Sequence, residues 1–189
     1  MTIKTFPSSS LALLPCLLQL FINCHAPVLA SSMSQRIPDN LKVKSSEVLL
    51  LSAKGRGVQI YQCEPKADDS SRFEWTFKAP VADLFNNQGK KIARHYKGPT
   101  WEANGNKVVG KIQESANSPD STAIPWLLLT AKSYKGQGFF TKVTKIQRID
   151  TAGGKAPKTG CDSSHQNAQV RVHYQATYNF YGAAQVKRN

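Results

Sequence analysis

Apolar and polar residues alternate without a break from residue 169 to residue 180, and this pattern excludes a helix there. One set of alternate positions is apolar: Val170, Val172, Tyr174, Ala176, Tyr178 and Phe180. The intervening set is polar: Gln169, Arg171, His173, Gln175, Thr177 and Asn179. A period of two is the period of a β-strand, whereas an α-helix would distribute both sets around its circumference. The segment therefore predicts an antiparallel strand with one face on a core and the other in solvent.

Shorter β-rich segments separated by turn residues fill the rest of the chain. The expected strands cover residues 47–53, 58–63, 72–78, 90–96, 107–113, 123–131 and 139–149. We interpret 55–57 (GRG) as a hairpin turn, Asn104-Gly105 as a tight turn and the uneven apolar spacing in 139–149 as a β-bulge. No segment shows a helical period or an internal repeat. The fold class is therefore all-β, a single-domain antiparallel sandwich or partly closed barrel of about eight strands.

Residues 1–30 have the three-part layout of a secretory signal peptide. Lys4 supplies a positive charge, an apolar run extends over residues 11–22, and small Ala30 closes the segment. A membrane anchor would instead need about 18 uninterrupted apolar residues, and proline and amide side chains interrupt this run. The sequence predicts cleavage after Ala30, which leaves one exported domain over residues 31–189 without a transmembrane anchor. Its expected location is the cell envelope, the periplasm or the extracellular medium.

Two of the four cysteines remain after that cleavage, Cys63 and Cys161. An even number of cysteines in an oxidising compartment favours a disulfide between them. A metal-binding or catalytic thiol is the alternative, but neither cysteine has another cysteine or a histidine close by in the spacing typical of such sites.

Six motifs resemble one known family in their order and spacing. They are GVQIYQC at 57–63, HYKGPTW at 95–101, AIPWLLL at 123–129, IQRIDTAGG at 146–154, PKTGC at 157–161 and YNFYG at 178–182. The chain resembles the DUF3455 family of secreted bacterial and fungal proteins over residues 37–182. The resemblance implies export, a two-cysteine arrangement and a β fold. It supplies no catalytic residues, because the family is defined as one of unknown function.

The motif that begins at His95 is the best candidate for a ligand site. Gly98-Pro99 bends the chain and would set His95, Tyr96 and Trp101 around one concavity. The alternative is a packed aromatic corner in which Trp101 covers the edge of the core. The spacing of the histidines matches no metal-binding pattern, and no serine lies in a nucleophile-elbow motif. We therefore expect no metal, no cofactor and no catalytic residue, so an enzyme is not favoured.

A strong positive charge accompanies these candidates. The formal net charge is +13, and removal of residues 1–30 with their single lysine leaves +12. The densest basic cluster contains Lys90, Lys91, Arg94 and Lys97. Such a surface attracts anionic polymers, although an evenly charged soluble surface explains the same counts. Nucleic acid is not an expected partner, because the chain lacks a recognition module.

The leading hypothesis is a non-catalytic binding protein for an acidic glycan or cell-surface polymer. Its expected contacts combine the basic cluster with aromatic side chains, and the candidate residues are Tyr61, Trp75, Lys90, Lys91, Arg94, His95, Tyr96 and Trp101. One alternative is a small secreted metal-dependent or hydrolytic enzyme centred on His95. Another is a structural or stress-related envelope protein without a small ligand.

Overall fold

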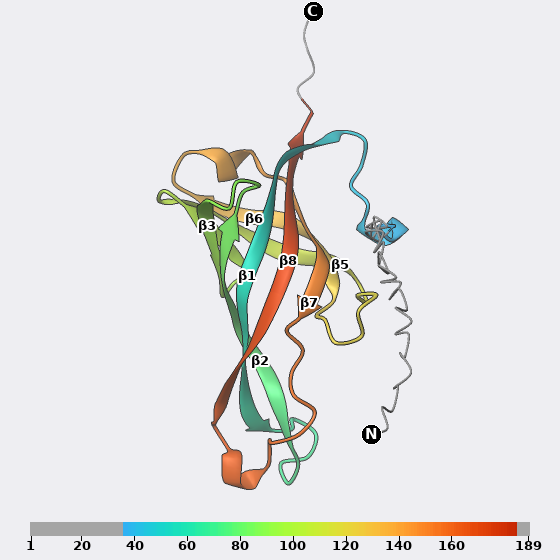
Figure 1. Cartoon of the computed structure of the whole chain (residues 1–189), viewed down its shortest axis with the longest axis vertical. Helices are drawn as coiled ribbons and strands as arrows, with labels where there is room; N and C mark the ends of the chain where they lie inside the picture. Colours follow the sequence, from blue (N-terminus) through green and yellow to red (C-terminus); the bar gives the residue numbers. More distant parts are fainter. Residues whose placement is uncertain (1–35, 185–189) are drawn as a thin grey trace, which may run out of the picture. The chain divides into compact units, whose positions relative to one another are not determined.

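Eight antiparallel strands form a closed barrel in the computed structural model, which describes residues 36–184 (Figure 1). The strands are β1 (Glu47–Pro65), β2 (Phe73–Phe85), β3 (Lys91–Tyr96), β4 (Thr100–Ala103), β5 (Asn106–Ala116), β6 (Trp126–Lys135), β7 (Lys145–Gly153) and β8 (Gln169–Ala183). Three short 3₁₀ turns are η1 (Asp39–Leu41), η2 (Phe139–Lys142) and η3 (Ser163–His165). Each strand pairs with its sequence neighbours, and β8 pairs with β1 to close the ring. The predicted all-β class is confirmed, and of the two predicted architectures the barrel is the one observed.

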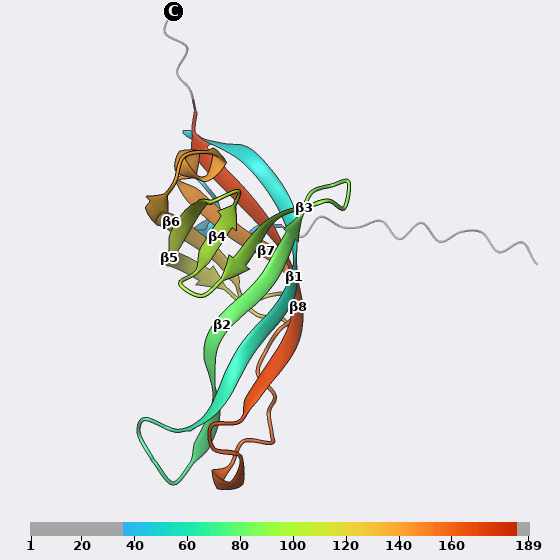
Figure 2. The same cartoon turned by 90° about the vertical axis from the view of Figure 1, so that its left-hand side faces the viewer.

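Three strands are much longer than the others. β1, β2 and β8 contain 19, 13 and 15 residues, and they continue beyond the barrel as a ribbon, which Figure 2 shows from the side. Cys63 lies in this ribbon opposite Trp75 of β2, and its sulfur is bonded to that of Cys161. The predicted disulfide is confirmed. It fastens the segment after β7 to the ribbon.

The predicted hairpin turn at residues 55–57 is wrong, because β1 passes straight through them. Gly55 and Gly57 are instead positions of close approach. A Cβ atom on Gly55 would lie 2.5 Å from the ring of Tyr178, and one on Gly57 would lie 2.1 Å from the carbonyl oxygen of Val81. The glycines therefore make room for an interior ring and for the neighbouring strand.

Two other segments refine the predicted strands. The predicted tight turn is confirmed, since Asn104 and Gly105 have φ values of 49° and 75° and join β5 to the short strand β4, which the sequence did not indicate. Residues 139–149 do not form one bulged strand: the first part is η2, and β7 begins at Lys145. The irregularity in β7 falls further along, next to Asp150, whose φ is 49°.

The core lies on both sides of the barrel wall. At the end of the barrel next to η2, the buried rings of Phe140 and Phe180 lie 5.5 Å apart, and Trp101 lies 6.1 Å from Phe180. A second, smaller cluster lies outside the wall, where Leu41 of η1 packs with Trp126 and other apolar residues. The interior at the other end of the barrel is the part that the core leaves open.

Candidate functional site

A cavity of about 340 Å³ lies inside the barrel. Most of its lining is apolar, and every lining residue belongs to a strand of the barrel or to a loop at its rim: Gln59, Tyr61, Phe77, Lys78, Pro80, His95, Lys97, Gly98, Pro99, Trp101, Ile112, Ile124, Pro125, Leu127, Leu129, Arg148 and Tyr178. Concave, mainly apolar sites with a few polar groups are typical of small-molecule binding sites. This volume is near the lower end of their usual range.

The mouth of the cavity lies between β2 and β5. The β3–β4 hairpin separates these strands only near one end, because β3 pairs with residues 82–85 of β2 and β4 pairs with residues 106–109 of β5. Beyond the hairpin neither strand pairs with any other described strand on this side. Phe77 and Ile112 line the cavity here and are 50% and 54% exposed. The short hairpin therefore leaves an opening with apolar edges in the barrel wall.

His95 forms part of the inner wall. Its Nδ1 atom lies 2.9 Å from the carbonyl oxygen of Thr100, so Nδ1 carries the hydrogen and Nε2 is free to accept one. The ring stacks on Trp101 at a centroid distance of 4.4 Å. Burial lowers the pKa of His95 to about 3, although the hydrogen bond to Thr100 opposes this shift. His95 is therefore neutral at physiological pH.

Arg148 brings a positive charge to the cavity. In the strand register it lies between Leu127 of β6 and Tyr178 of β8, both of which also line the cavity. Its Nε and Nη2 atoms donate hydrogen bonds to the carbonyl oxygen of Pro125 at 3.1 and 2.8 Å. Within residues 36–184 no carboxylate forms a salt bridge with it. Its guanidinium group is thus held by neutral groups, the carbonyl oxygen of Pro125 and the hydroxyl of Tyr178.

The remaining polar groups are mainly hydrogen-bond donors. Among the residues that the structure describes, the side-chain nitrogen of Gln59, which is 2% exposed, has no hydrogen-bond partner, and neither has the indole nitrogen of Trp101. The hydroxyl of Tyr61 donates to the carbonyl oxygen of Gly154 at 2.6 Å. Burial raises the pKa of Tyr178, and the positive charge of Arg148 opposes that shift. The tyrosine stays protonated and adds no negative charge.

The structure brings together three of the eight residues that the sequence predicted for the site. Tyr61, His95 and Trp101 line the cavity. Trp75 lies on the ribbon, where its indole nitrogen donates to the carbonyl oxygen of Thr159 at 3.0 Å. The cavity lies beside His95 and Trp101, whereas Tyr96, which was expected to share it, is not among the lining residues, and Trp101 is also part of the core.

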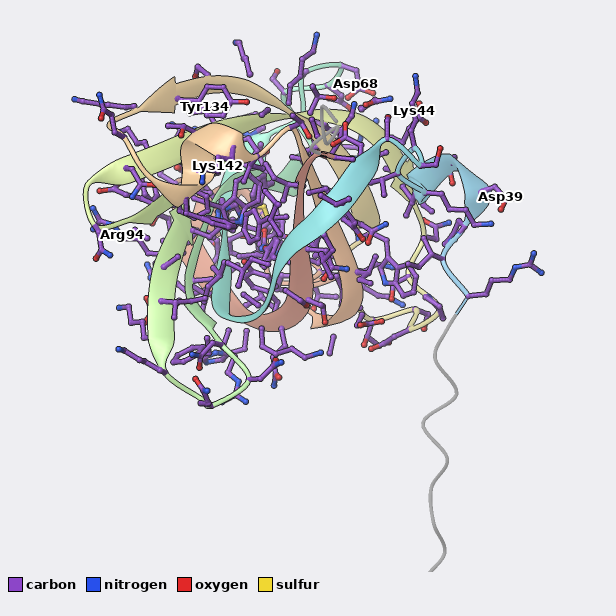
Figure 3. The ribbon with its side chains drawn as sticks, turned by 90° about the horizontal axis from the view of Figure 1, so that it is seen from above. Asp39, Lys44, Asp68, Arg94, Tyr134 and Lys142 are labelled. Carbon is purple, nitrogen blue, oxygen red and sulfur yellow. A yellow bond between two sulfur atoms is a disulfide. The ribbon has the colours of Figure 1, made fainter. Side chains whose placement is uncertain are left out.

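Neighbouring residues on β3 face away from the cavity. Arg94 lies on the outside of the wall (Figure 3), forms an ion pair with Glu102 at 3.1 Å and lies over the ring of Tyr96. Tyr96 donates a hydrogen bond to the same carboxylate, and this bond raises the pKa of its phenol. Lys91 pairs with Asp83 at 2.7 Å, and Lys90 lies in an exposed turn. Alternation along β3 puts Arg94 and Tyr96 on the opposite face from His95. Lys97, which belongs to the same predicted basic cluster, does line the cavity.

Sequence reasoning missed Gln59, Arg148 and Tyr178 as site residues. Tyr178 was predicted as core, which is correct for its position but does not reveal the cavity beside it. Arg148 had no clear signal, because its segment also contains the polar residues Gln147 and Asp150.

No group of three or more His, Cys, Asp or Glu side chains in the described part of the chain is arranged to hold a metal ion. Among the same residues, no helix is long and apolar enough to cross a membrane.

Comparison with known proteins identifies the family. The family described as "Protein of unknown function (DUF3455)" matches residues 44–182. No curated protein and no solved structure matches the chain. The match covers all eight strands except Ala183, the last residue of β8. The chain therefore belongs to the DUF3455 family.

Proposed function

We propose that this protein binds one small, largely apolar molecule inside the barrel. The observation that carries the proposal is the unfilled part of the interior. An eight-stranded barrel is just wide enough either to be packed with its own side chains or to hold one small ligand. Here Phe140 and Phe180 pack one part of the interior, and the cavity of about 340 Å³ occupies another.

The cavity opens to solvent through an apolar mouth, which supports the same function. Phe77 and Ile112 are half exposed there, and exposed apolar side chains beside a cavity are typical of ligand sites. Two free strand edges beside the opening leave room for a molecule to enter without breaking the ring of strands.

An acidic glycan or cell-surface polymer on the outer face is the alternative occupant. A polymer is too large for this cavity, and the outer cations Lys91 and Arg94 already have carboxylate partners. Exposed ion pairs are weak and exchange with solvent ions, so these residues are still able to contact an anionic polymer. Retention on an anionic glycan matrix beyond that of an unrelated protein of equal charge would favour this alternative.

The hydrolytic or metal-dependent alternative depends on His95. With a pKa of about 3 the buried ring is a weak base at neutral pH, and general bases work best with a pKa near the operating pH. The ring is better suited to shape the wall and to accept a hydrogen bond. Binding without catalysis is therefore the function we propose.

We also propose that the protein is exported and processed after Ala30, a position outside the described residues. The Cys63–Cys161 disulfide supports this location, because such bonds persist in oxidising compartments. The N-terminal residue of the exported product tests the proposal: it should be Ser31, and a product that retains residues 1–30 would contradict it.

Blocking the mouth tests the binding proposal. We expect 2-naphthamide, a neutral probe, to bind saturably, and Ile112→Trp to weaken binding at least about tenfold by filling the opening. Val81→Trp is the matched control, because Val81 is 45% exposed on β2 and does not line the cavity. Isothermal titration calorimetry measures the affinity of the wild type and of both variants for the probe. The proposal fails if the wild type binds neither this probe nor its carboxylate analogue 2-naphthoate, or if both variants bind the probe equally.

A further inference from the structure

We propose that the ligand of this cavity is a small monoanion, an apolar body that carries one carboxylate. The inference rests on the proposed binding function and adds the charge and the polar group of the ligand. It depends on the charges of the residues that line the cavity and on which of their polar groups donate hydrogen bonds.

The charge of the lining is entirely positive. Arg148, Lys78 and Lys97 line the cavity, and no aspartate or glutamate does so. Lys78 is neutralised by Glu64, whose carboxylate lies 2.5 Å from its ammonium nitrogen. Arg148 and Lys97 form no salt bridge with any other residue in the range 36–184. A cation beside apolar walls is unfavourable unless an anion accompanies it, and a bound ligand would supply that anion.

The hydrogen-bond donors that line the cavity also require an acceptor. A guanidinium group has five N–H bonds, and the carbonyl oxygen of Pro125 engages only the Nε and Nη2 atoms. The side-chain nitrogen of Gln59 is a second donor, buried and without a partner. A carboxylate accepts several hydrogen bonds at once and matches the planar guanidinium in a bidentate pair. The unused donors thus select a carboxylate over a neutral hydroxyl.

None of the neighbouring titratable groups supplies the missing negative charge. Tyr61 and Tyr178 are phenols whose pKa values are raised by burial, so both stay protonated at neutral pH. His95 is neutral and fixed by its hydrogen bond to Thr100. The rest of the wall is aliphatic or aromatic, including Leu127 and Leu129. It suits an apolar ligand body with a single charged end.

A pair of isosteric probes tests the inference. 2-Naphthoate and 2-naphthamide have nearly the same shape and differ in charge. We expect the wild type to bind 2-naphthoate at least about tenfold more tightly than 2-naphthamide, because only the carboxylate neutralises Arg148. Arg148→Met should remove this preference, because the affinity for 2-naphthoate should fall to about that for 2-naphthamide. Isothermal titration calorimetry at neutral pH measures both constants.

Two further variants complete the test. Arg171→Met removes an exposed arginine from the outer face of β8 and should leave the preference intact. Arg148→Lys keeps the charge without the planar fork, so it should retain part of the preference and serves as the test protein if Arg148→Met does not fold. Equal affinity of the wild type for both probes would overturn the anion inference and leave the binding proposal intact. Failure of both probes to bind would overturn the binding proposal itself.

Discussion

His95 is buried with its neutral form favoured, and this couples the stability of the protein to pH. Its pKa is lowered from 6.5 to about 3 in the folded protein, chiefly by burial. Between these values the unfolded chain binds a proton that the folded protein excludes. The free energy of unfolding should therefore fall as the pH decreases below 6.5, by at most about 1.4 kcal/mol per pH unit for this one group.

Urea unfolding between pH 6.5 and about 5 measures this slope. Exposed carboxylates such as Asp162 contribute at lower pH, because their reference pKa of 3.8 lies below this window. His95→Gln is the matched variant, since an amide donates to Thr100 but does not titrate. It should flatten the wild-type slope across the window. An unchanged slope would mean that His95 becomes protonated in the folded protein near its ordinary pKa.

At the scale of the strands, the barrel depends on two positions in β1 where no side chain fits. Gly57 lies opposite Ala82 in β2, and a Cβ atom there would meet backbone atoms that cannot move aside. Gly57→Ala should lower the free energy of unfolding by about 1–3 kcal/mol, the usual range for overpacking. Urea unfolding at neutral pH measures the change.

Arg56→Ala is the control for this substitution. Arg56 is exposed between the two glycines, and its main contact is with the ring of Phe85 at 5.6 Å. Loss of an exposed cation–π contact costs about 0.5–1 kcal/mol. If Gly57→Ala were no more destabilising than Arg56→Ala, the close packing of β1 on β2 would be refuted, and a turn at residues 55–57 would regain support.

The pattern of side chains predicted the strands better than it predicted their lengths or partners. The alternation of apolar and polar residues located β8 and several shorter strands, because it is a local property of each segment. Gly55 and Gly57 misled the analysis, since a glycine at a turn and one at a close approach look alike in a sequence. Only the paired strand and the ring of Tyr178 distinguish the two cases.

The same limit applies to the site. His95 and Trp101 were within reach of sequence reasoning because a short hairpin joins them, and they pair directly across it. Arg148 was not within reach of sequence reasoning. Its place in the cavity depends on the register of β7 with β8, in which Arg148 pairs with Tyr178. Alternation along β3 could have excluded Arg94 and Tyr96, since His95 lies between them and faces inward.

At the scale of the whole molecule, one covalent bond joins the ribbon to the chain that follows β7. Cys63 and Cys161 are 98 residues apart, so their bond closes a loop that spans most of the barrel strands. Restricting so long a loop removes conformational entropy from the unfolded chain. Hydrogen bonds hold the same region together, among them Trp75 to Thr159 and Tyr61 to Gly154. The disulfide therefore stabilises the protein by restricting the unfolded chain, while these hydrogen bonds fix the position of the segment after β7 in the folded protein.

Removal of the disulfide should destabilise the barrel without changing its fold. For Cys63→Ala/Cys161→Ala we expect the free energy of unfolding to fall by about 2–5 kcal/mol, because the unfolded chain gains freedom. Urea unfolding measures this change, and circular dichroism should show the same β signal as the wild type. A reducing agent should lower the wild-type midpoint and leave that of the double variant unaltered, which also controls for Cys16 and Cys24. A wild-type midpoint that reductant does not move would show that the loop is held by its non-covalent contacts alone.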